Sequence, residues 1–221
     1  MKTCLFFLCF AFSLVGCGDT SEAGSTTSAG NTRSLSELLA DGVVQLVSLR
    51  GTGGSTGTVL EGRLLNTTNR SLKIDTLLSP AIYFMNHGRG QNMVATAIYG
   101  RGGAYYTDAR SNRQYITLNS KTENDVVFWA YCADLYKDNP QTHETLSIGT
   151  PPPVIANVAE KIRIHQGKIT SSQVNDFMIA AQLVLWLAQG ETLDEISRKY
   201  KFDSRHTAIA QDILETPSTL P

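Results

Sequence analysis

Few residues in this sequence combine a reactive side chain with a suggestive spacing. Cysteine occurs at positions 4, 9, 17 and 132, and only Cys132 lies outside the N-terminal region. It ends the apolar run 126–131 and has His143 downstream. A thiol with an imidazole nearby is the combination used by cysteine nucleophiles, so a Cys132–His143 pair is one hypothesis. The histidines are scattered without metal-ligand spacing, so we predict neither a metal site nor a cofactor.

A glutamine in the middle of an apolar segment is the second unusual feature. Residues 177–188 are apolar except for Gln182. A run of about twelve residues suits a buried helix and is too short to span a bilayer. A helix that is apolar on all sides is normally buried on all sides. We therefore expect the fold to pack around this helix, with Trp186 in the core and partners opposite the Gln182 amide.

The segments before Cys132 have the pattern of short strands. Between residues 38 and 132, apolar or alternating runs are separated by turns rich in glycine and asparagine. This spacing is typical of antiparallel strands. The glycine-rich segment 51–58 lacks the lysine and the glycine spacing of a phosphate-binding loop, so it is interpreted as a turn between strands. We predict an antiparallel β-sandwich over residues 37–150.

Helical periodicity begins after the proline run 151–153. Capping residues are predicted before three helices, at Thr170, Thr192 and Ser204. Strands followed by helices indicate an α+β fold, so we expect a C-terminal helical, bundle-like subdomain over residues 151–216, packed on the sandwich.

Two segments together resemble a known family. Tyr131-Cys132 and the segment 181–186, Ala-Gln-Leu-Val-Leu-Trp, are similar to the signature motifs of bacterial thioester domains, the adhesin modules of Gram-positive surface proteins. In that family, a cysteine sulfur and a glutamine side-chain carbonyl carbon form an internal thioester, within a β-sandwich that carries a helical subdomain. The resemblance implies that Cys132 and Gln182 form such a bond, open to attack by an amine or hydroxyl of another surface. Ala181 replaces the threonine that is usual in the family, and the two motifs are closer together than usual.

The N-terminus has the features of an export signal. Lys2 precedes the apolar run 5–12, and small residues follow. The segment 14–17, Leu-Val-Gly-Cys, resembles the lipobox of bacterial lipoproteins. The resemblance implies cleavage before Cys17 and acylation of that cysteine, which anchors the protein in a membrane. Residues 1–16 are then the signal peptide, and 17–36 are the lipidated cysteine and a flexible tether.

These features predict a location and a class of function. We expect a protein of the bacterial cell envelope that faces away from the cytoplasm, in the outer membrane if the host is Gram-negative. The net charge of −1 does not favour nucleic acid, and the helix-turn-helix-like segment 192–214 is interpreted as packed helices, because an exported protein does not meet the chromosome.

The predicted function is binding or adhesion, without enzyme activity, since no paired carboxylates or Ser-His-Asp set is found. Two alternatives remain open: an exported enzyme that uses Cys132, and an assembly or structural lipoprotein without chemistry. The second would recognise its partner through a group of tyrosines, Tyr83, Tyr99, Tyr105 and Tyr106.

Overall fold

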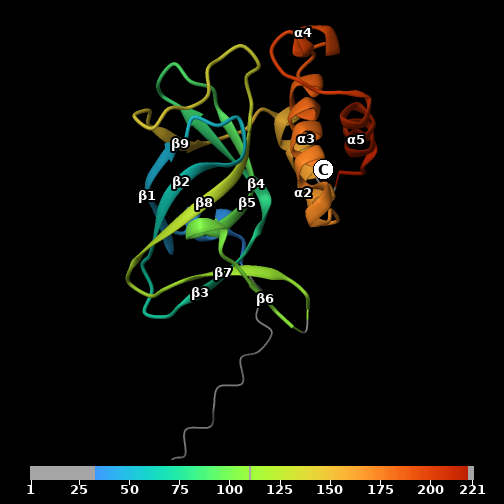
Figure 1. Cartoon of the computed structure of the whole chain (residues 1–221). Helices are drawn as coiled ribbons and strands as arrows, with labels where there is room; N and C mark the ends of the chain where they lie inside the picture. The colour runs from blue at the N-terminus through green and yellow to red at the C-terminus, as the bar shows by residue number, and fades with distance from the viewer. Residues whose placement is uncertain (1–32, 110, 219–221) are drawn as a thin grey trace, which may run out of the picture. The chain divides into compact units, whose positions relative to one another are not determined.

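The computed structural model describes residues 33–109 and 111–218. The predicted signal peptide, Cys17 and most of the predicted tether lie outside these residues. The described part is a mixed α+β structure with antiparallel sheets, as expected from the sequence (Figure 1). None of its helices is long and apolar enough to cross a membrane.

The strands all lie before residue 150. They are β1 (Val44–Gly51), β2 (Thr56–Asn66), β3 (Leu72–Asp75), β4 (Leu77–Asn86), β5 (Met93–Gly100), β6 (Tyr106–Thr107), β7 (Gln114–Leu118), β8 (Glu123–Cys132) and β9 (Leu146–Gly149). The helices are α1 (Leu35–Ala40), η1 (Arg101–Gly103), α2 (Pro153–Gln166), η2 (Ser171–Gln173), α3 (Val174–Ala188), α4 (Leu193–Ser197) and α5 (Ser204–Glu215).

The strands form two antiparallel sheets. The larger has the order β1-β2-β8-β5-β4-β9, and the smaller has the order β3-β7-β6. Strand β8 lies inside the larger sheet, where it pairs with β2 on one side and β5 on the other. Its side chains alternate between more and less buried positions, and its last three residues are all buried. Cys132 therefore lies in the interior of the protein, at the end of a central strand.

Local capping interactions set the helix ends. Thr192 forms a capping box with Glu195 at the start of α4, as the sequence predicts. At α5 the capping residue is Asp203, whose carboxylate accepts hydrogen bonds from the backbone N–H groups of Arg205 and His206. Ser204, predicted as the cap, is the first helical residue, because aspartate one position earlier supplies the stronger, charged acceptor.

Helix α1 is not predicted from the sequence. Ser34 and Glu37 form a capping box at its start, and Leu35 and Leu38 are buried. The small, polar composition of residues 17–36 predicts a tether that includes Leu35 and Ser36. The two leucines instead bring this end of the chain onto the body of the protein, where α1 contacts β1 and β4.

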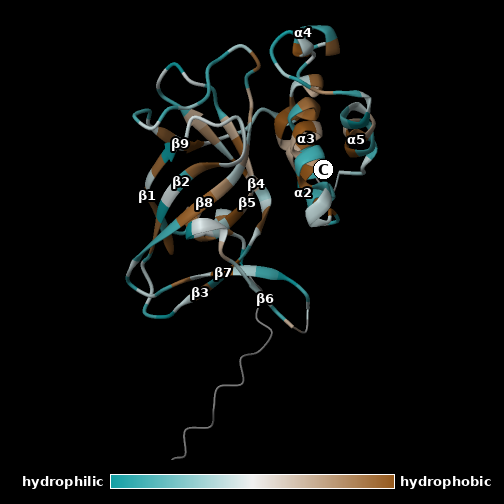
Figure 2. Cartoon of the chain, viewed as in Figure 1, coloured by the Kyte–Doolittle hydropathy of each residue, from teal (hydrophilic) through white to brown (hydrophobic). Residues whose placement is uncertain are grey.

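Helix α3 is the buried helix that the sequence predicts. It contacts α2, α5, β2 and β8, and its residues 180–186 are all buried. Figure 2 shows apolar residues along much of its length. Trp186 is 4% exposed and packs edge-on against Tyr200, with 5.2 Å between ring centroids. The prediction of a buried helix over residues 177–188 with Trp186 in the core is confirmed.

Candidate functional site

Cys132 and Gln182 meet where the end of β8 lies against the middle of α3. The Cys132 backbone N–H donates to Gln182 Oε1 at 2.8 Å, and Gln182 Nε2 donates to the Cys132 carbonyl oxygen at 2.7 Å. Both residues are 0% exposed. The two residues singled out in the sequence are thus in direct contact, although 50 positions separate them.

The strand pairing explains why the Cys132 backbone is available. In an antiparallel ladder, successive residues direct their N–H and C=O groups to opposite neighbours. The next residue, Ala133, donates its N–H to Asn92 O beside β5, so the Cys132 groups face the β2 side. Strand β2 begins at Thr56, the partner of Tyr131, and does not extend further. The Gln182 amide occupies the place of a neighbouring strand, with one acceptor and one donor for the two free backbone groups.

The Cys132 thiol lies in a pocket of oxygen acceptors. Its Sγ is 3.0 Å from Ser55 O and 3.6 Å from Asn139 Oδ1. Burial raises the pKa of the thiol, and the negative charge of the Asp134 carboxylate raises it further. A hydrogen bond with the Gln91 side chain lowers the pKa in part. The group is therefore protonated at neutral pH, and its proton points toward carbonyl-type oxygens.

Three loops close over this thiol. Asn139 Nδ2 donates to Gly53 O, and Asn139 Oδ1 accepts from Gln91 Nε2. These bonds join the β1–β2, β4–β5 and β8–β9 loops. The carboxylate of Glu144 reinforces the junction, because it accepts hydrogen bonds from the N–H groups of residues 89, 90 and 141 and from the Asn86 side chain. These donors lower the pKa of Glu144 to about 2. The loops therefore keep water away from the sulfur.

Two hydrogen bonds with the Cys132 backbone fix the orientation of the Gln182 amide. The Cys132 N–H points at Oε1, the atom on which negative charge develops when a nucleophile adds to the amide carbon. A fixed donor at that position stabilises such an oxyanion. The hydrogen bond from Nε2 to Cys132 O fixes the nitrogen that would leave. An internal acyl transfer requires contact between the sulfur and the amide carbon, together with exclusion of water from both.

Comparisons with protein-family models, curated proteins and solved structures found no match. The interpretation of the site therefore depends on the arrangement of its own residues.

The other residues proposed from the sequence lie elsewhere. His143 is exposed, and none of the hydrogen bonds of the Cys132 thiol within the described residues involves it. Tyr83 is buried and Tyr99 is half-buried, whereas Tyr105 and Tyr106 are 47% and 61% exposed. The tyrosines thus divide between packing and surface positions. Within residues 33–109 and 111–218, no cluster of His, Cys, Asp and Glu could hold a metal ion.

The loop residues around the thiol are not predicted from the sequence. Gln91, Asn139 and Glu144 belong to polar loops. These loops contain many amides and carboxylates, and nothing in the sequence distinguishes these three from the others. The one signal available was position, because polar residues in loops after strand ends often carry function. Ser55 contributes only its backbone oxygen, which its residue type does not reveal.

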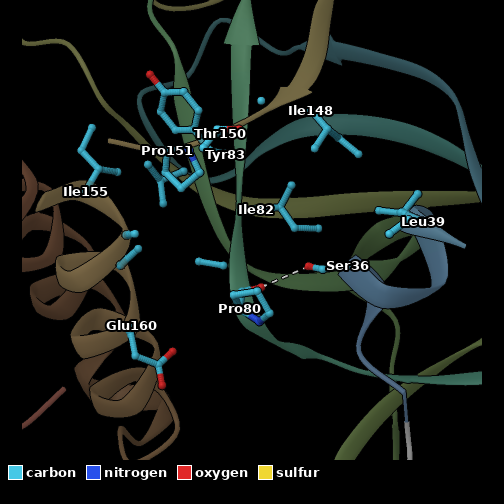
Figure 3. A pocket seen from close by; sticks show the side chains of 16 residues that line it. Ser36, Leu39, Pro80, Ile82, Tyr83, Ile148, Thr150, Pro151, Ile155 and Glu160 are labelled. Carbon is cyan, nitrogen blue, oxygen red and sulfur yellow. Dashed lines mark hydrogen bonds between the residues drawn. The ribbon is translucent and has the colours of Figure 1, made fainter. Parts of the chain in front are cut away.

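A separate apolar cavity of about 430 Å³ lies between α1, β4, β9 and the first turns of α2 (Figure 3). Its walls include Leu39, Ile82, Ile148 and Ile155, and Glu160 lies at one end. The Glu160 carboxylate forms two hydrogen bonds with the Arg163 guanidinium, at 2.6 and 2.7 Å. No cysteine or histidine lines the cavity, so we assign it no part in the chemistry of Cys132.

Proposed function

We propose that this chain is a lipid-anchored adhesion protein of the bacterial envelope in which Cys132 and Gln182 form an internal thioester. The observation that carries the proposal is the pair of hydrogen bonds between the Gln182 amide and the backbone of Cys132, in a buried site closed by three loops. We interpret the two sheets as a β-sandwich that presents this site, and α2–α5 as a helical subdomain that supplies the glutamine.

The bond would form by exchange of an amide for a thioester. The Cys132 sulfur attacks the side-chain carbonyl carbon of Gln182, and the carbon–nitrogen bond breaks. The nitrogen leaves as ammonia and takes the thiol proton. A primary amine on a partner surface then attacks the same carbon, forms an amide bond and restores the thiol. The overall result is a covalent link between this protein and its partner, with no oxidant or cofactor consumed.

The intact mass of the mature protein tests the proposal. It should be lower by one ammonia than the mass of the mature sequence plus the lipid on Cys17, and one thiol should be missing in a titration of the denatured protein. Methylamine should react at Gln182 to give an N-methylamide and release the thiol. Cys132→Ser, which keeps a hydroxyl for Ser55 O, is the matched control and should show the full sequence mass. A natural protein with full mass and a free Cys132 would rule out the thioester.

The membrane anchor needs a separate test. Labelled fatty acid should enter the protein in cells, and Cys17→Ala should abolish the labelling and block processing or release the chain from membranes. Cys132→Ser should leave the labelling unchanged, so the two parts of the proposal fail independently. Membrane retention of the natural protein without any label would contradict the lipoprotein assignment.

A structural lipoprotein without chemistry is the second candidate. It is favoured by the fact that both polar atoms of the Gln182 side chain already have hydrogen-bond partners. Burial also raises the pKa of the thiol, which disfavours the nucleophilic thiolate. In this case Gln182 only joins α3 to β8, and the mass measurement gives a free thiol. An exported enzyme using Cys132 has less support, because no histidine hydrogen-bonds to the thiol within the described residues.

A further inference from the structure

A second cleft, of about 680 Å³, lies between the sheets and the junction of α2 with α3. Its lining combines aromatic rings with planar polar groups: Tyr99, Tyr105, Trp129, Arg113, Gln114 and Gln166. Neither Cys132 nor Gln182 lines it. The volume is in the range of about 300–1,000 Å³ that small-ligand sites occupy. The cleft is thus a candidate binding site separate from the thiol.

Three aromatic side chains form a continuous wall. The Tyr99 ring centroid is 6.0 Å from that of Tyr105 and 6.3 Å from that of Trp129, with the rings tilted by about 60°. Tyr105 is 47% exposed, whereas Tyr99 and Trp129 are half-buried. Trp129 Nε1 donates to Tyr131 OH at 2.8 Å, which fixes the indole ring. Trp129 therefore presents a fixed face to a ligand that stacks on it, and the two tyrosine rings extend this aromatic surface.

Gln166 provides a directed hydrogen-bond donor in the same cleft. It is 8% exposed, and its Oε1 accepts a hydrogen bond from Thr96 Oγ1 at 2.6 Å. Its Nε2 makes no hydrogen bond to any described residue, although the side chain lines the cleft. This nitrogen is not among the fully buried side-chain atoms that lack a partner, so it is accessible to a ligand or solvent that accepts its hydrogen bond. Since Thr96 fixes which end of the amide faces the protein, the donor end faces the cleft.

The charged groups at the rim are already neutralised. Arg113 pairs with Asp75, and Arg163 pairs with Glu160 through two hydrogen bonds. Each guanidinium has five N–H groups, so both keep donors beyond those used in these pairs. A charged ligand would compete with these ion pairs, whereas a neutral ligand rich in hydroxyl groups would use the remaining donors.

We propose that this cleft binds a saccharide. The aliphatic face of a pyranose ring stacks on the Tyr99, Tyr105 and Trp129 wall, and a ring oxygen or hydroxyl accepts from Gln166 Nε2. Gln114 and the arginines at the rim bind further hydroxyls. The cleft would hold the protein on a glycan-bearing surface by reversible contacts. This inference does not depend on the thioester, because no residue of the Cys132 site lines the cleft.

Tryptophan fluorescence can report binding directly. The sequence contains two tryptophans, so Trp186→Phe leaves Trp129 in the cleft as the single emitter. The full mature protein, kept in a detergent without sugar headgroups, is titrated with maltose, cellobiose, lactose, chitobiose and the disaccharide of N-acetylglucosamine and N-acetylmuramic acid. At least one should change the Trp129 emission with saturation. Preference for the last sugar indicates the bacterial cell wall as the source, and preference for lactose indicates a host glycan.

Neighbouring variants separate the cleft from general surface effects. Tyr105→Ala should weaken binding by up to about tenfold through loss of one stacking ring. Gln166→Glu keeps an acceptor for Thr96 but replaces the donor, so it should weaken binding by about tenfold or more. Tyr106→Ala is the matched control, because Tyr106 is 61% exposed, adjacent in sequence and outside the cleft lining, and it should bind as the parent does. Failure of every sugar to bind, or an equal loss with Tyr106→Ala, would overturn the proposal.

Discussion

Replacing Trp186 with alanine should lower the free energy of unfolding by about 3–5 kcal/mol. The side chain is 4% exposed in the middle of the core that α3 forms with its neighbours. Its removal forfeits the edge-on contact with Tyr200 and leaves a cavity that closely packed neighbours fill only in part. Urea unfolding followed by far-ultraviolet circular dichroism measures the loss as a lower midpoint at constant slope.

Trp186→Phe is the control for this prediction. It keeps an aromatic ring against Tyr200, and it removes the Trp186 Nε1–H, which is buried without a hydrogen-bond partner among the described residues. The loss of contact area is thus partly offset by the removal of an unsatisfied donor. We expect a clearly smaller loss than for alanine. An alanine variant that loses less than about 1 kcal/mol, as typical surface substitutions do, would show that α3 is not central to the core.

The sequence predicts the parts of this fold that depend on local patterns. Helix α3 was found because an apolar run with one polar residue must be buried, and α4 because Thr192 and Glu195 form a capping box within four residues. The glycine turn between β1 and β2 was found because its residues suit turns. In each case the determining contacts lie within a few positions of one another in the chain.

Arrangements that depend on distant residues could not be predicted in this way. The order β1-β2-β8-β5-β4-β9 joins strands far apart in sequence, and alternation of side chains does not specify a neighbour. Helix α1 was missed because six residues give too little periodicity, although Leu35 and Leu38 are buried. The motifs singled out Cys132 and Gln182, but the hydrogen bonds between them depend on where β2 begins. The Gln166 donor likewise follows from its bond to Thr96, 70 positions away.

Replacing Gln182 with alanine should destabilise the protein whether or not a thioester forms. The change leaves the Cys132 N–H and carbonyl without partners at a position that is 0% exposed. Each backbone group left unpaired costs about 1–3 kcal/mol. The Gln182→Ala variant loses both hydrogen bonds to the Cys132 backbone as well as the amide that would form the thioester. A loss of reactivity toward methylamine in this variant would therefore not by itself identify Gln182 as the bond-forming group.

Gln182→Glu separates the two effects. A protonated carboxyl has one carbonyl oxygen and one O–H, so it can accept from the Cys132 N–H and donate to the Cys132 oxygen as the amide does. Burial raises the pKa of such a carboxyl above its unfolded value of about 4.3. The variant should therefore approach natural stability below about pH 4 and lose stability as the pH rises through the raised folded pKa. Urea unfolding of both proteins at about pH 4 and about pH 8 measures this difference.

With no amide nitrogen to release, the Gln182→Glu variant should show its full sequence mass and a free Cys132 thiol, even at the acidic pH where the fold is retained. A mass deficit of one ammonia that persists in Gln182→Glu would place the bond on another side chain, and a stability difference independent of pH would show that position 182 does not contact the Cys132 backbone.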